Sequence, residues 1–125
     1  MEQQKRTILV IDDDGRNIFA LTATLRSKGY KCISAGSVSE AIDLLKATDG
    51  TGIILLDMMM PDMDGYEAIP RFKNLAESEG LPIIAVTAQA MKGDRERCIA
   101  AGADDYIAKP VNVDMLLGIL KRYIG

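Results

Sequence analysis

Three apolar runs of this sequence are each followed by residues that could bind a metal ion or a phosphate. The runs and the residues after them are 8–11 before Asp12, Asp13 and Asp14, 53–56 before Asp57, and 83–86 before Thr87. Short continuous apolar runs are typical of strands buried on both faces of a parallel sheet. Ligands of such sheets bind beyond the carboxyl ends of the strands. Because crowded carboxylates repel one another unless a proton or a metal offsets them, the pattern predicts a Mg²⁺ site that handles phosphate.

The same residues supply the parts of a phosphoryl transfer site. Asp57, at the end of a central strand, can act as the nucleophile, and Asp12 and Asp13, either or both, can hold Mg²⁺ beside it. Thr87 offers a hydroxyl group and Lys109 a compact positive charge that can reach phosphoryl oxygens. Catalysis of phosphoryl transfer is mostly positioning and neutralisation of charge, so an attacking carboxylate needs no separate base.

These residues must be positioned by alternating strands and helices. The expected strands are 8–11, 30–34, 53–56, 83–86 and 106–107; the expected helices are about 16–28, from Ser37 or Ser39 to about 46, from 65 to near Gly80, 91–101 and 111–123. This alternation predicts an α/β fold with a doubly wound five-stranded parallel sheet, because right-handed crossovers place helices on both faces. Pro70 falls within the third helix, where we expect a bend or a late start.

The matched set of Asp12, Asp13, Asp57, Thr87 and Lys109-Pro110, in this order and spacing, resembles the receiver domain of two-component response regulators. The resemblance covers essentially the whole chain, so we expect one receiver domain over residues 1–125. It implies a flavodoxin-like (β/α)5 fold with strand order 2-1-3-4-5. It also implies that the domain catalyses its own aspartyl phosphorylation and dephosphorylation and is otherwise no enzyme.

The resemblance assigns a role to each residue of the site. Asp57 would accept a phosphoryl group from a phosphohistidine, and Asp12, Asp13, Asp57 and the backbone carbonyl of Met59 would hold Mg²⁺. Thr87 and Lys109 would hold the phosphoryl oxygens, assisted by the backbone N–H groups of Met58 and Ala88. Tyr106 would be the switch aromatic, and the Lys109-Pro110 peptide bond would be cis.

Two further motifs concern the protein in which this domain operates. Residues 16–22 and 90–96 look like the corresponding segments of receivers carried by hybrid sensor histidine kinases, although some free-standing regulators share the second motif. The expected partner is a histidine kinase or a histidine phosphotransfer domain, since the chain contains no histidine that could serve as phosphodonor. We expect this partner to dock on the first helix, whose apolar residues form two opposite stripes that one sheet cannot bury together: Ile18, Leu21 and Leu25, against Phe19, Ala20 and Ala23.

Composition excludes several other classes of protein. The chain has 125 residues, 48% of them hydrophobic, and a net charge of -3, which gives no basic surface for nucleic acid. Residues 1–6 lack the apolar segment of a signal peptide and no stretch could span a membrane, so we expect a cytoplasmic location and no membrane contact. We also expect a monomer or weak dimer. Cys32 and Cys98 are expected to be buried thiols.

Four rival functions can be tested against the same residues. A flavin site would need a phosphate-binding loop where three aspartates stand, and no Walker-type loop is present. The segment 62–65 resembles part of a calcium loop, but Arg71 occupies the position of the required glutamate. The alternative that stays open is a receiver-like scaffold that binds protein partners without being phosphorylated.

Overall fold

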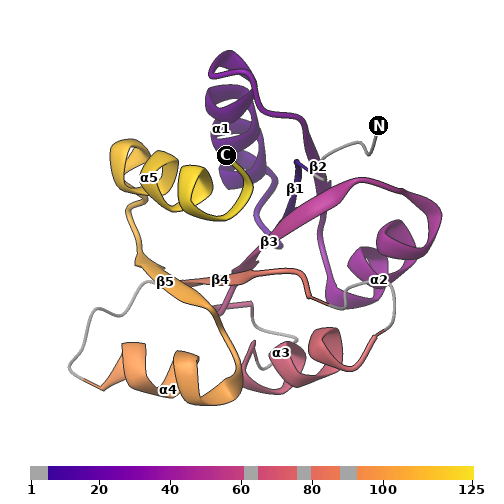
Figure 1. Ribbon diagram of the computed structural model, residues 1–125, viewed down its shortest axis with the longest axis vertical. Coiled ribbons are helices and arrows are strands. Elements are labelled where there is room, and N and C mark those ends of the chain that lie inside the picture. The colour runs from indigo at the N-terminus through magenta and orange to yellow at the C-terminus, as the bar shows by residue number, and fades with distance from the viewer. Residues whose placement is uncertain (1–5, 61–64, 76–79, 88–92) are drawn as a thin grey trace.

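Five parallel strands form one sheet in the order β2-β1-β3-β4-β5, with helices on both faces (Figure 1). The computed structural model describes residues 6–60, 65–75, 80–87 and 93–125. The strands are β1 (Thr7–Ile11), β2 (Cys32–Ala35), β3 (Thr51–Asp57), β4 (Ile83–Thr87) and β5 (Asp105–Ala108). The helices are α1 (Gly15–Ser27), α2 (Val38–Ala47), α3 (Gly65–Lys73), α4 (Asp94–Ala101) and α5 (Val113–Ile124). The predicted α/β class, parallel sheet and strand order are confirmed.

Alternate residues of each strand enter two separate hydrophobic cores. Ile8 and Val10 of β1 pack with α1 and α5, whereas Leu9 and Ile11 pack with α2, α3 and α4. The same alternation divides β3 and β4, because successive side chains of a strand point to opposite faces. Figure 1 shows the two helix layers, with α1 and α5 on one side of the sheet and α2, α3 and α4 on the other.

The starts of α1 and α2 are set by side chains that accept backbone hydrogen bonds. The Asp14 carboxylate caps α1 by accepting from the Arg16 N–H at 2.9 Å. Of the two serines proposed as the cap of α2, the structure selects Ser37, whose hydroxyl accepts from the Glu40 N–H at 3.1 Å. Such caps satisfy N–H groups that have no partner inside the helix.

Two predicted helix boundaries are wrong. The third helix ends at Lys73 and not near Gly80, because the Leu75 N–H bonds to the Phe72 carbonyl three residues back, a spacing that ends an α-helix. The last helix begins at Val113 and not at Val111, because the Asn112 side chain caps it by accepting from the Met115 N–H at 3.0 Å.

The other differences are smaller. Pro70 lies inside α3, which begins at Gly65, so the late start expected there is not observed. The fourth helix begins at Asp94 after Gly93, whose φ of 99° suits glycine, and the predicted start at Met91 lies outside the described residues. β2 begins and ends slightly later than predicted, and β3 and β5 are longer. Within the described segments, no helix is both long enough and apolar enough to cross a lipid bilayer.

Candidate functional site

The strand register places the predicted site residues along one edge of the sheet. Asp57 is the last residue of β3 and Thr87 the last of β4, and the register pairs Asp57 with Val86 and Thr87 with Ala108. Asp12 follows β1 directly, and its N–H bonds to the Ala35 carbonyl at 3.1 Å. Asp12, Asp57 and Thr87 are all buried, with exposed fractions of 7%, 4% and 4%. Buried polar groups at the carboxyl ends of parallel strands occupy the usual place for a ligand in this class of sheet.

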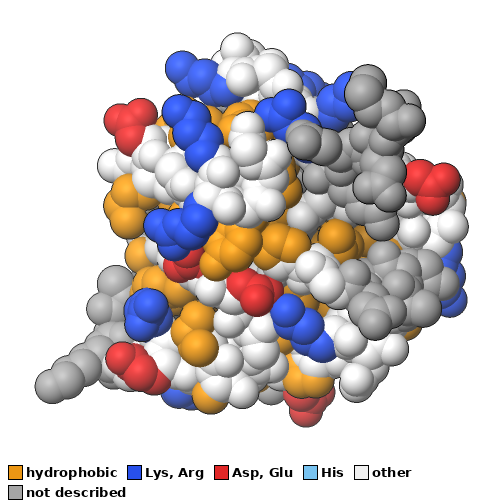
Figure 2. Space-filling view, in the orientation of Figure 1, with side chains coloured by type: hydrophobic (Ala, Val, Ile, Leu, Met, Phe, Trp, Pro, Cys, Tyr) orange, Lys and Arg blue, Asp and Glu red, His pale blue; other side chains and the backbone are white. Residues whose placement is uncertain are grey.

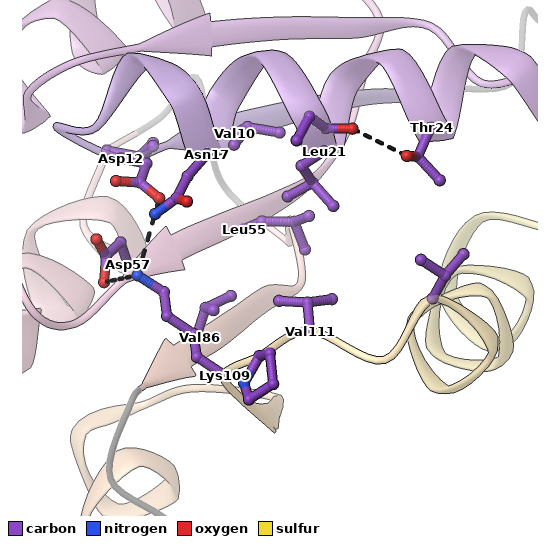
Figure 3. Close-up of a pocket in the computed structure, with 14 residues that line it drawn as sticks. Val10, Asp12, Asn17, Leu21, Thr24, Leu55, Asp57, Val86, Lys109 and Val111 are labelled. Atoms are coloured by element: carbon purple, nitrogen blue, oxygen red, sulfur yellow. Dashed lines mark hydrogen bonds and ion pairs between the residues drawn. The ribbon is translucent and has the colours of Figure 1, made fainter.

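The alternation of side chains decides which face each acid approaches. Asp12 follows Val10 by two residues and Asp57 follows Leu55 by two, so both carboxylates lie on the side of the sheet that carries α1 and α5. Figure 3 shows Asp12 and Asp57 turned toward the same space, with the Lys109 side chain extending to meet them. The carboxyl ends of three separate strands, β1, β3 and β5, therefore deliver charge to one point.

Three carboxylates form a compact cluster at this point. Asp12, Asp13 and Asp57 each offer an oxygen, and these oxygens all lie within 4.8 Å of one another. The Lys109 Nζ lies 3.3 Å from Asp57 Oδ1 and 3.9 Å from Asp12 Oδ2. One ammonium group thus faces three carboxylates, which leaves an excess of negative charge among the described residues of the site.

Backbone N–H groups fix the two buried carboxylates. The Met59 N–H donates to Asp57 Oδ1 at 2.9 Å, and the Asp14 N–H donates to Asp12 Oδ1 at 2.9 Å. Each bond reaches back two residues, as in the Asx turns that aspartate forms where a strand ends. These bonds hold the carboxylates in place before any ligand binds, so little reorganisation is needed when one does.

The electrostatics of Asp12 reflect this crowding. Burial raises the pKa of Asp12 above its ordinary value, and the negative charge of Asp57 raises it further. The Asp14 N–H bond and the positive charge of Lys109 act against this rise in pKa. The charged form of Asp12 is therefore costly in the metal-free site, and a bound cation would offset that cost.

The donor set fits Mg²⁺. This ion is bound through oxygen ligands, commonly one or two carboxylates together with water, and the cluster offers three carboxylates of which Asp13 is exposed to solvent. Met59, the fourth predicted ligand, adjoins the cluster through its N–H bond to Asp57. The role of its carbonyl oxygen stays a prediction.

Several details implied by the family resemblance can be compared with the structure. The Lys109–Pro110 peptide bond is cis, as expected. Tyr106 lies on β5 in register with Ala85 and packs against the core formed with α2, α3 and α4. The role expected for the Met58 N–H is wrong here, because that group donates to the Val86 carbonyl at 2.8 Å within the sheet. Ala88 lies outside the described residues.

A groove extends from this cluster between α1 and the segment that leads into α5. Its volume is about 530 Å³, and its walls include apolar residues of both segments, among them Leu21, Val111 and Val113. The side chains of Val10, Leu55 and Val86 line it from the sheet (Figure 3). Asn17 of α1 also lines the groove; sequence reasoning noted it only as part of a motif and assigned it no role. The position of Asn17, five residues after Asp12 and on the first turn of a helix, was the signal that could have identified it.

Comparisons with known proteins agree with this geometry. The response regulator receiver domain family matches residues 8–121. The polar-differentiation response regulator DivK of Brucella ovis is 33% identical over 120 residues, which are 96% of this chain and 97% of DivK. The crystal structure of the receiver domain of sensor histidine kinase PA1611 from Pseudomonas aeruginosa PAO1, with a magnesium ion coordinated in its active-site cleft, is 37% identical. It superimposes with a TM-score of 0.83 over 96% of this chain and 98% of that domain.

A third likeness concerns the fold alone. The receiver domain of Ssk1 from Saccharomyces cerevisiae, crystallised with the histidine phosphotransfer protein Ypd1, has a TM-score of 0.84 at 24% identity and covers 99% of this chain and 92% of Ssk1's. The family match and the DivK relationship carry the assignment, and both extend across the sheet edge described above. This chain belongs to the family of response regulator receiver domains of two-component signalling.

Proposed function

We propose that residues 1–125 act as one receiver domain that accepts a phosphoryl group on Asp57 in the presence of Mg²⁺. The observation that carries the proposal is the arrangement around Asp57, a buried carboxylate with two further acids within 4.8 Å and the Lys109 ammonium at 3.3 Å. A nucleophile, a metal site and a counter-charge for phosphoryl oxygens are thus gathered at one point. Phosphoryl transfer requires little more than this.

The metal would be held by Asp12, Asp13 and Asp57 and by the Met59 carbonyl oxygen. When bound, Mg²⁺ supplies positive charge that offsets the carboxylates and the phosphoryl oxygens. Lys109 would hold one phosphoryl oxygen from its place between Asp57 and Asp12, and the Thr87 hydroxyl would hold another. The Met59 N–H orients the Asp57 carboxylate for attack.

The covalent step is a displacement at phosphorus. A bond forms between an Asp57 carboxylate oxygen and phosphorus while the bond from phosphorus to the donor breaks, and its electron pair leaves with the donor. No base is required because Asp57 attacks as an anion. The domain thereby promotes its own phosphorylation, and water later reverses it.

Labelling with a small phosphodonor tests this proposal. Acetyl phosphate with Mg²⁺ should add one phosphoryl group to the chain, and peptide mass mapping should locate it on Asp57. Asp57→Ala should abolish labelling, whereas Asp43→Ala, which removes an exposed carboxylate from α2, should leave it unchanged. Undiminished labelling of Asp57→Ala would refute the assignment, and a wild-type chain that takes neither phosphoryl nor beryllofluoride would favour the partner-binding scaffold.

Thr87 and Tyr106 are proposed to form the conformational switch. The register pairs Ala85 with Tyr106 and Thr87 with Ala108, so the Thr87 and Tyr106 side chains lie on the same face of neighbouring strands. A phosphoryl group that draws the Thr87 hydroxyl toward Asp57 changes the space beside the Tyr106 ring. The surface of α4, β5 and α5 would change with it.

Nuclear magnetic resonance spectra with and without beryllofluoride test the switch. Resonances of Tyr106 and α4 should shift in the wild-type chain with Mg²⁺ and stay in place in Asp57→Ala. If the resonances of Asp57 shift and those of Tyr106 do not, the site binds the phosphoryl mimic without moving this switch.

The phosphodonor is proposed to be a histidine-bearing protein that docks on α1. The chain contains no histidine, and α1 begins three residues after Asp12. Of its two apolar stripes, the structure buries Leu25 and leaves Phe19 75% exposed. Figure 2 shows hydrophobic side chains on the surface of the molecule among charged ones. An exposed aromatic ring on the helix that begins just after the acids suits a docking surface.

A charged substitution at Phe19 tests the docking surface. Phe19→Asp should slow transfer from a phosphorylated histidine phosphotransfer protein by about tenfold or more, as expected for an interface aromatic. Labelling by acetyl phosphate should be unchanged. Ile99→Asp, on α4 and 38% exposed, is the matched control and should affect neither donor. No loss for Phe19→Asp would remove α1 as the docking surface.

A further inference from the structure

Asn17 occupies the mouth of the site. It is the third residue of α1 and lines the groove together with Asp12, Asp57 and Lys109. Figure 3 shows its side chain extending from α1 toward Asp12, with the carboxamide near the acids. Asn17 is exposed to solvent, whereas Asp12 and Asp57 are buried. A ligand that enters through this groove therefore meets the Asn17 carboxamide at its exposed rim.

The described residues give the carboxamide no structural task that would account for it. A polar side chain at the third position of a helix can reach back to the N–H of the capping residue. Here that residue is Asp14, and its N–H already donates to Asp12 Oδ1 at 2.9 Å. Over residues 6–60, 65–75, 80–87 and 93–125, the Asn17 side chain forms no hydrogen bond. Its donor and acceptor atoms are available to a ligand.

Depth within the site indicates which part of the ligand Asn17 meets. In an in-line displacement the phosphorus lies between the attacking oxygen and the leaving group, so the leaving group is the part farther from Asp57. The groups proposed to hold the phosphoryl oxygens lie deeper than Asn17: Thr87 is 4% exposed and the Lys109 side chain 25%. A group at the exposed rim is placed beside the leaving group.

We propose that Asn17 is a specificity-determining residue whose carboxamide oxygen hydrogen-bonds to the imidazole ring of the phosphodonor; this rests on the function proposed above. In the transfer step an Asp57 oxygen forms a bond to phosphorus and the phosphorus–nitrogen bond breaks. The electron pair returns to that ring nitrogen. The other ring nitrogen carries a proton, so the ring leaves as neutral imidazole.

Asn17 acts on that second nitrogen. Its Oδ1 accepts the hydrogen bond from the ring N–H, which orients the ring and favours the protonated form that leaves as a neutral molecule. A carboxamide suits this place better than a carboxylate, since it adds no charge to a cluster that already holds three acids. Acetyl phosphate presents no ring N–H, so its reaction does not use Asn17.

Two small phosphodonors separate this role from a structural one. Rates of Asp57 labelling are measured with phosphoimidazole and with acetyl phosphate, each with Mg²⁺, in the wild type and in Asn17→Ala, Asn17→Gln and Asn74→Ala. Loss of one hydrogen bond to a charged ring should lower the phosphoimidazole rate of Asn17→Ala by about tenfold. The acetyl phosphate rate should stay within about twofold, the range expected where no interaction is lost.

The two companion variants control for other effects. Asn17→Gln keeps the carboxamide and should recover part of the phosphoimidazole rate. Asn74→Ala makes the same change at an exposed residue after α3 and should alter neither rate. Alanine is the better helix former, so Asn17→Ala should remain folded.

Each outcome bears on the inference separately from the proposed function. A selective loss of the phosphoimidazole rate supports it. An unchanged rate with phosphoimidazole overturns it, and so does an equal loss with both donors, which would place Asn17 at the metal or the phosphoryl group. A wild-type chain that neither donor labels would instead refute the proposed function.

Discussion

The two faces of the sheet differ in how completely the helices close over them. On the face covered by α2, α3 and α4, Ala68, Ile69 and Phe72 of α3 are fully buried against strand residues. On the face covered by α1 and α5, a groove of about 530 Å³ stays open beside Asp57. The first face has the packing that stabilises a domain, and the second keeps a path from solvent to a reactive carboxylate. Stability and access are thus assigned to opposite sides of one sheet.

The largest contrast in stability should come from truncating one apolar side chain on each face. Phe72→Ala should lower the free energy of unfolding by about 3–5 kcal/mol, because it leaves a cavity in a closed core. Leu21→Ala, at a half-buried position that lines the groove, should cost less than about 2 kcal/mol. Urea unfolding of both variants measures the difference, and equal losses would show that the two faces are packed alike.

Removing the Lys109 ammonium group from the acid cluster should have the next largest effect. Lys109→Ala leaves Asp57 and Asp12 without their counter-charge, so the Mg²⁺-free protein should lose about 1–3 kcal/mol of stability, between the values for exposed and buried ion pairs. Lys121→Ala, on the exposed side of α5, is the control. Thermal unfolding in a chelating buffer tests this, and an unchanged midpoint for Lys109→Ala would show that the pair contributes nothing.

Removing one acid from the same cluster should act in the opposite direction. Asp13→Ala relieves repulsion between carboxylates whose oxygens lie within 4.8 Å of one another. It should raise the stability of the Mg²⁺-free protein by about 1 kcal/mol, the order of the interaction between two such charges in water. The wild-type thermal midpoint should rise as Mg²⁺ is added, because the ion binds the native state. Asp13→Ala should show a smaller rise, and an equal response to Mg²⁺ in both proteins would contradict the metal assignment.

The sequence predictions are accurate where a pattern of several neighbouring residues decides the structure, and less accurate where a single hydrogen bond decides it. Strands β1, β3 and β4 were predicted because their continuous apolar runs leave few other structures for residues that must be buried on both sides. The ends of α3 and α5 were misplaced because each depends on one hydrogen bond, such as the Asn112 cap, that competes closely with a further helical turn. The Met58 N–H was misassigned because a resemblance does not show that the Val86 carbonyl takes it.

The predictions for the site also divide into those that strand patterns decide and those that helix packing decides. Asp12, Asp57, Thr87 and Lys109 could be placed at one edge from sequence, since every parallel strand ends there. The exposure of Phe19 and the position of Asn17 in the groove could not, because they depend on how α1 rotates against the sheet. Two apolar stripes on one helix left both orientations open.

The sequence by itself determined how strands and helices alternate along the chain and which reactive groups follow the strands, because local patterns of burial and charge specify both. Only the tertiary structure decided the separations of 3.3 Å and 3.9 Å between Lys109 and the two acids, and the groove between α1 and α5. Those features arise where segments far apart in the chain meet, and their geometry depends on the packing of every side chain between them.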